Sequence, residues 1–485
     1  MDIDSLPIRS IRPVHPIHRL FRLLPLPLAL AGCAGFSGDG GIDRVSALSR
    51  ERTGHALSAP GSQHDGGARR TALLSAPLTA DSAVELALLN NKRLQVSLAE
   101  LGIAEADLVQ AGRMRNPRFS FGRVSGNGEV EIDRAVLLDL SALLTLPLRR
   151  AIEERRFSQA QLQTALQAVR IATDTRRAYF QAVAAKQSVT YMQQVGLAAD
   201  ASAELAQRMA KAGNWGKLED AREQAFRAEV RTQLSRAQHA ERAARERLVR
   251  LLGLSEDHAA LTLPDRLPDL PAVTVEAGPI EARALSQRLD VQVARQETES
   301  TAKFLGLTRA TRFVNVLEAG YQNRSATGES RADGYEVELS LPLFDWGTAR
   351  VRRAEATYLR SLQRTADIAV QARSEVREYW SAYETSYRVA RQYRDEIVPA
   401  RKRVSDEVLL RYNGMLASVF ELLADARSQI ASINAAIEAQ RDFWIAESEL
   451  QFAIHGGSPA AAIAFPAASP GAGTAASAPA PAAPH

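Results

Sequence analysis

The chain has 485 residues, a net charge of +4 and a single cysteine. Its positive charge forms no basic block, so the composition excludes a nucleic-acid-binding surface of the usual kind. Charged residues make up 24% of the chain and aromatic residues 6%, which fits long solvated helices.

The N-terminus has the pattern of a secretory signal. A basic leader runs to Arg22, and the apolar stretch that follows is far shorter than the ~20 residues that cross a bilayer as a helix. Leu30, Ala31 and Gly32 then precede Cys33, a sequence that resembles the bacterial lipobox. An ordinary signal peptide with a chance cysteine is the alternative. We predict a lipoprotein signal peptide over residues 1–32 and a covalent lipid on Cys33.

Differences in amino-acid composition divide the rest of the chain into a tether, two repeats, a linker and a tail. Residues 33–77 are rich in Gly, Ser and Arg and are expected to form a flexible, lipidated tether. Ser82 and Glu85 form a candidate capping box for one helix that extends to about Arg115. The expected units are a first repeat (78–262), a Pro-rich linker (263–279), a second repeat (280–456) and a disordered Ala/Pro-rich tail (457–485).

The two repeats share a sequence of landmarks. In each, Leu-Pro-Leu is followed by a long Ala/Gln/Arg/Glu-rich stretch that is interrupted near a glycine and closes on another glycine. The landmarks are Leu146-Pro147-Leu148, Gly213 and Gly253 in the first copy, and Leu341-Pro342-Leu343, Asn413-Gly414 and Gly456 in the second. A spacing of about 200 residues is far beyond a solenoid period and indicates a duplicated half-protein.

Four strands are predicted, over residues 119–124, 136–146, 313–322 and 335–341. The last is the clearest, because Tyr335, Val337 and Leu339 alternate with polar residues. Four strands cannot close a barrel, and open edges are not tolerated in lipid. The strands therefore form either a soluble sheet or a barrel to which several chains contribute.

The long stretches carry heptad spacing, which predicts two antiparallel coiled-coil hairpins. One seam consists of Val376, Trp380, Tyr383, Tyr387 and Ala390, and another of Leu423, Ala426, Ile430, Ile433 and Ile437. The aromatic stripe could line a binding groove, but at this spacing packing is the interpretation we adopt.

Together these features resemble the TolC family of outer membrane efflux factors. The local matches are the segments from Leu339 to Gly347 and from Ala83 to Asn91. The resemblance implies a mainly α fold with a small β part, in which a homotrimer pools four strands per chain into a twelve-stranded transmembrane β-barrel. The helical hairpins would form a periplasmic tunnel. It also implies an outer membrane location in a Gram-negative bacterium, a periplasmic adaptor, and an inner-membrane pump of RND or ABC type.

In this family the helix interruptions are hairpin tips that contact the adaptor. The corresponding candidates here are Gly213, Trp215, Asn413, Gly414 and Met415. Members often place an acidic residue six positions after the tip glycine. Glu219 has that spacing from Gly213, whereas Glu421 has it only from Met415, so the second tip departs by one residue.

Glu219 and Glu421 have two interpretations. Rings of these glutamates in a constriction would attract cations. Alternatively, both are solvated first-turn residues that favour a helix N-terminus. Trp215 either contacts the adaptor or covers the apolar seam of its hairpin.

No catalytic, nucleotide-binding or metal-ligand motif stands out, and the histidines are scattered. We therefore expect no enzyme activity, no metal and no cofactor other than the lipid on Cys33. The predicted function is a passive outer membrane duct of a tripartite export system. The alternative is a lipid-anchored periplasmic coiled-coil protein that spaces the envelope without a channel.

Overall fold

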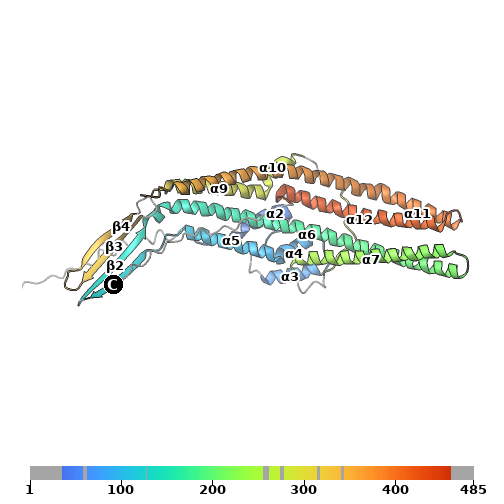
Figure 1. Ribbon diagram of the computed structural model, residues 1–485, viewed down its shortest axis with the longest axis horizontal. Helices are drawn as coiled ribbons and strands as arrows, with labels where there is room; N and C mark the ends of the chain where they lie inside the picture. The colour runs from blue at the N-terminus through green and yellow to red at the C-terminus, as the bar shows by residue number, and fades with distance from the viewer. Residues whose placement is uncertain are drawn as a thin grey trace, which may run out of the picture.

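The computed structural model describes residues 35–57, 63–126, 128–254, 261–272, 278–313, 317–339 and 343–459. They form an elongated rod of helices with a small sheet at one end (Figure 1). The expected signal peptide, Cys33 and residues 460–485 of the expected tail lie outside the described residues. At the start of that tail, Gly457 packs against Asp290 and Ser458 is buried.

The expected flexible tether is wrong over much of its length. Helix α2 (Ile42–Thr53) lies against the long helix α6 (Leu140–Lys211), and helix α3 (Gln63–Leu74) follows. Val45 is fully buried in the main hydrophobic core. The close approach of Gly41 to Phe157, at a φ of 75°, brings α2 onto α6. A few apolar residues on one helix face are enough to dock this segment, although its average composition is polar.

The single helix expected after this segment is two helices, α4 (Ala80–Asn90) and α5 (Lys92–Ala111). The capping box uses Thr79 and Ser82 rather than Ser82 and Glu85. The break falls at Asn91. Its Oδ1 accepts from the Arg93 amide at 2.9 Å, and its Nδ2 donates to the Leu251 carbonyl at 2.8 Å.

The four expected strands are confirmed as one antiparallel sheet in the order β1-β2-β3-β4. They are β1 (Arg118–Gly126), β2 (Glu129–Asp139), β3 (Leu317–Ala326) and β4 (Ala332–Leu339). The second was expected over residues 136–146 but extends from Glu129 to Asp139. It ends there because the Asp139 carboxylate accepts from the Ala142 amide at 2.7 Å and caps α6. Leu146-Pro147-Leu148 therefore lies inside a helix.

The duplication and both hairpins are confirmed. In the first repeat, α6 has 72 residues, about 110 Å at 1.5 Å per residue, and α7 (Lys217–Leu252) returns along it. In the second repeat, α8 (Ile280–Gln287) and α9 (Leu289–Ala310) correspond to α4 and α5. Its hairpin consists of α10 (Thr348–Gln392), a π-helical turn η3 (Tyr393–Ile397), α11 (Val398–Asn413) and α12 (Val419–His455).

The aromatic heptad positions form the contact between α10 and α12 within the second repeat, so the packing interpretation of the aromatic stripe is confirmed. Val376 and Tyr383 are buried against Phe443 of α12, and the Phe443 and Trp444 rings lie 5.1 Å apart. In the first repeat the Tyr179 hydroxyl donates to the Leu78 carbonyl, and burial raises its pKa to about 12.

We expect Asn91→Ala to lower the free energy of unfolding by about 1–3 kcal/mol, because it removes a helix cap and leaves the Leu251 carbonyl without its donor. Urea unfolding of the purified protein, followed by circular dichroism, measures the change. Asn214→Ala, at an exposed position between α6 and α7, is the matched control. Equal midpoints for the two variants would contradict this role of Asn91.

Candidate functional site

The two hairpins turn at the same end of the rod, opposite the sheet (Figure 1). The first turn joins α6 to α7 between Lys211 and Lys217, and the second joins α11 to α12 between Asn413 and Val419. The five candidate tip residues predicted from the sequence all lie in or beside these turns.

The two turns have the same backbone geometry. In the first, the Gly213 and Asn214 amides donate to the carbonyls three and five residues earlier, at 3.1 and 3.0 Å. In the second, the Met415 and Leu416 amides do the same at 3.0 and 2.8 Å. This is the hydrogen-bond pattern of a Schellman motif, in which one residue adopts the left-handed conformation.

The left-handed residue is Gly213 in the first turn, with φ 76°, and Met415 in the second, with φ 60°. Gly414 has φ −80° and is not the equivalent of Gly213. The apparent one-residue departure of the second tip is therefore corrected: Glu421 follows Met415 by the same six positions that separate Glu219 from Gly213.

Both glutamates lie in the first turn of a helix. Glu219 is half-buried and folds back over Gly216, where a Cβ would meet its Oε2 at 2.5 Å. Glu421 is exposed, and its backbone amide donates to the Ser418 hydroxyl at 3.2 Å. Neither carboxylate has an ion pair among the described residues, so within one chain both are compatible with a solvated first turn. Trp215 is half-buried.

A second pair of acids lies one turn further from the tips. Glu223 and Asp425 occupy equivalent positions in the two hairpins, and both are buried. Glu223 is 2% exposed and accepts from the Ser202 hydroxyl at 3.0 Å. Burial raises the pKa of Glu223, and the Ser202 hydrogen bond and the charge of Arg427 oppose the rise only in part. This pair was not predicted from the sequence, although Glu223 and Asp425 each follow Glu219 and Glu421 by four residues, one helical turn.

The hairpins are held together near the tips by two arginine–phenylalanine contacts. The Arg222 guanidinium of α7 lies 5.0 Å from the Phe420 ring of α12, and Arg427 of α12 lies 5.3 Å from the Phe226 ring of α7. Phe226 and Leu423 belong to a small apolar cluster beneath them. Such contacts contribute about 0.5–1 kcal/mol each at exposed sites, which makes this end the weaker part of the rod.

At the other end, the register divides the sheet into two unlike faces. Directly opposed residues share a face, and Phe119, Val136, Tyr321 and Tyr335 form one row across all four strands. The adjacent rows place Phe121, Leu138 and Val337 on the same face, and the next row adds Leu339. All eight side chains are exposed.

The opposite face is charged. Asp139, Glu318 and Glu338 form one row there, and Arg324 forms ion pairs with Glu131 and Asp133 at 2.9 and 3.0 Å. The sheet therefore exposes a broad apolar surface on one side only, which is unusual for a protein surrounded by water.

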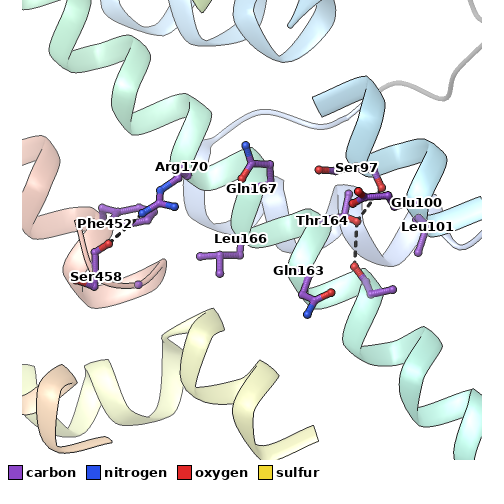
Figure 2. Close-up of a pocket in the computed structure, with 12 residues that line it drawn as sticks. Ser97, Glu100, Leu101, Gln163, Thr164, Leu166, Gln167, Arg170, Phe452 and Ser458 are labelled. Atoms are coloured by element: carbon purple, nitrogen blue, oxygen red, sulfur yellow. Dashed lines mark hydrogen bonds between the residues drawn. The ribbon is translucent and has the colours of Figure 1, made fainter. Parts of the chain in front are cut away.

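A cavity of about 180 Å³ lies midway along the rod between α5, α6 and the end of α12 (Figure 2). Thr164 donates to the Ser97 carbonyl on one side, and Arg170 donates to the Ser458 carbonyl on the other. None of the predicted site residues lines it.

No helix in the described part of the chain is both long and apolar enough to span a bilayer. Over the same residues, no group of three or more His, Cys, Asp or Glu side chains is placed to hold a metal ion.

With this geometry established, the fold can be assigned to a class: it is the fold of solved outer membrane channels. The Campylobacter jejuni CmeC outer membrane channel matches with a TM-score of 0.69 and 16% identity over 78% of this chain and 86% of that one. The outer membrane protein VceC from Vibrio cholerae matches with a TM-score of 0.64 and 18% identity over 78% and 96%. A membrane protein from Pseudomonas aeruginosa matches with a TM-score of 0.68 and 18% identity over 77% and 93%.

In comparisons by sequence, no family model and no curated protein matches the chain. The structural likeness confirms the mainly α fold with a small four-stranded sheet that the resemblance implies.

The left-handed tip positions predict opposite responses to substitution. Met415→Gly should stabilise the second tip by about 1 kcal/mol, and Gly213→Ala should destabilise the first by about 1–2 kcal/mol, because only glycine adopts positive φ without strain. Hydrogen exchange at the amides of each tip measures local stability. Gly414→Ala, at φ −80°, is the control and should change little. Similar effects at Met415 and Gly414 would contradict the equivalence.

The raised pKa of Glu223 predicts a pH dependence. The folded protein binds this proton more tightly than the unfolded chain, so the contribution of Glu223 to stability falls as pH rises through its folded pKa. Glu223→Gln should unfold at a higher temperature than wild type at neutral pH, and the difference should shrink as the pH is lowered. Glu219→Gln, at a half-exposed carboxylate, is the control. A lower melting temperature for Glu223→Gln would contradict the prediction.

Proposed function

We propose that this protein is the outer membrane duct of a tripartite export system, through which substrates leave passively after an inner-membrane pump has supplied the energy. The observation that carries the proposal is the sheet: its apolar face is exposed, its order leaves β1 and β4 at open edges, and it lies at the end of two long hairpins. The likeness to solved outer membrane channels supports the same function.

An open sheet is unfavourable in lipid, because each edge carries backbone groups without partners. Three chains of four strands each would close a twelve-stranded barrel, an even number of the kind that outer membrane barrels use. The apolar face of the sheet would then contact lipid, and the charged face would line the lumen. The open edges and the single apolar face of the sheet therefore support a homotrimer.

The hairpin tips suit an adaptor protein. Met415 and Leu416 are 94% and 81% exposed, and Phe420 and Leu218 also expose large apolar surfaces. Clustered apolar side chains at an exposed end typically mark a binding site for another protein. We infer that a periplasmic adaptor docks here and connects the duct to a pump of RND or ABC type. Trp215 and Asn413 lie at the border of this surface.

The equivalent positions of Glu219 and Glu421 support an acidic constriction. In a threefold assembly each position would form a ring of three carboxylates near the tunnel end, which would favour cations. The exposed Glu421 is the better candidate for the lumen, since Glu219 folds back on its own turn. A lipid on Cys33 would anchor each chain to the outer membrane.

Single-channel conductance of the purified, lipidated protein in planar bilayers tests the proposal. We expect small, cation-preferring openings in wild type and larger, less selective openings in Glu421→Ala, because the mutation removes the ring of charge. Glu229→Ala, which removes an exposed carboxylate paired with Arg427 further from the tip, is the control.

Each other outcome has a distinct meaning. Openings that Glu421→Ala leaves unchanged would retain the duct and exclude Glu421 as a constriction. Well-folded protein that never conducts would contradict the duct and favour the alternative of a periplasmic coiled-coil spacer.

A further inference from the structure

On β2, β3 and β4, the apolar face of the sheet changes to polar side chains at one row of the register. Next to the row that contains Tyr321 and Tyr335, on the side away from the helices, Phe121 is followed across the sheet by Arg134, Asn323 and Asp333. These residues are on the same face as the aromatic row. The two rows are two residues apart along each strand, which is about 7 Å.

Hydrogen bonds hold this polar row in place. Asn323 is 3% exposed, and its Oδ1 accepts from Arg134 Nη1 and from Arg331 Nε, each at 3.1 Å. Its Nδ2 donates to Asp333 Oδ1 at 2.5 Å, and the Tyr321 hydroxyl donates to the same oxygen at 2.5 Å. One buried amide therefore positions two guanidinium groups side by side.

The charges of this group do not balance. Arg123 is on the same face in the next row, opposite Ile132. Three arginines (Arg123, Arg134 and Arg331) against one carboxylate (Asp333) leave a net charge of +2. The nearest other carboxylates on β2, Glu131 and Asp133, are on the opposite face and form ion pairs with Arg324.

Such a group is suited to bind an anion from outside the chain. On the lipid-facing side of a barrel, arginine is unfavourable near the midplane and tolerated near the interfaces, where tyrosines also gather. The Tyr321 and Tyr335 row followed by the arginines matches the passage from hydrocarbon to headgroups. Guanidinium groups bind phosphate with directed, charge-assisted hydrogen bonds.

We propose that Arg123, Arg134 and Arg331 form a binding site for the phosphate of an anionic lipid in the membrane leaflet farthest from the helical tunnel. The proposal rests on the proposed function, because it requires the apolar face of the sheet to contact lipid. Asn323 is a positioning residue: it holds Arg134 and Arg331 at one level and leaves their other N–H groups available to the lipid.

Native mass spectrometry of the full-length protein, with lipid A as the phosphate-bearing probe and phosphatidylcholine as the zwitterionic reference, tests the site. Each arginine near an anionic lipid surface contributes about fivefold in affinity. The double variant Arg134→Gln/Arg331→Gln should therefore retain lipid A roughly 25-fold more weakly than wild type. Arg324→Gln, which removes an arginine from the charged face of the same sheet, is the matched control and should retain lipid A as wild type does.

A variant that binds lipid A more tightly cannot be explained by misfolding, so it complements the double variant. Asp333→Asn removes the only carboxylate of the group and should strengthen lipid A retention by about fivefold. Unchanged retention in both the double variant and Asp333→Asn would overturn the proposal, as would an equal loss in Arg324→Gln.

Failure of this site is distinguishable from failure of the proposed function. Protein that conducts in planar bilayers but shows no preference for lipid A keeps the duct and overturns only the lipid site. Protein that does not enter bilayers at all overturns both.

Discussion

The rod depends on one kind of contact, made once in each repeat, between a break in the short helices and the glycine that closes the hairpin. In the first repeat Asn91 bonds to Leu251, and Gly253 packs so closely on Asn90 that a Cβ would meet its carbonyl oxygen at 2.6 Å. In the second, the Asp290 amide donates to the Gly456 carbonyl at 3.2 Å. These contacts fix where each hairpin ends against the short helices. Because the helices are so long, a small change in angle at this point would displace the tip by a large distance.

The middle of the rod and its hairpin tips differ in how they are stabilised. Near the middle, aromatic residues such as Tyr383 and Phe443 are buried between α10 and α12, and hydrophobic burial there is large. At the tips the hairpins meet through a small apolar cluster and exposed arginine–phenylalanine contacts. A buried Glu223, whose raised pKa reflects its burial, weakens that end further. This distribution suits a rod with a rigid middle and a distal end that can open.

Several elements were predictable because their signals are local. Alternation in residues 335–339 and heptad spacing around Tyr383 indicate which faces are buried, since strand and helix periods differ. The predictions failed where a single side chain redirected the chain. The Asp139 carboxylate starts α6 eight residues before Pro147, and Asn91 divides one apparent helix into two. At the second tip, residue preference favours Gly414 as the left-handed residue of the turn. Met415 adopts that conformation instead, because the hydrogen bonds of the turn fix which position is left-handed.

The amino-acid sequence by itself determined the duplication, the four strands, the paired hairpins and the absence of a recognisable catalytic motif, because each follows from periodicity or composition along the chain. Only the tertiary structure decided which residues meet across it. The register that places Arg134 and Arg331 on Asn323, the buried pair Glu223 and Asp425, and the equivalence of Glu219 with Glu421 all depend on how separate segments align. Shifting a strand by one residue would move every side chain to the other face. Arg134 of β2 and Asn323 of β3 are 189 residues apart, so no turn between these two strands fixes their alignment.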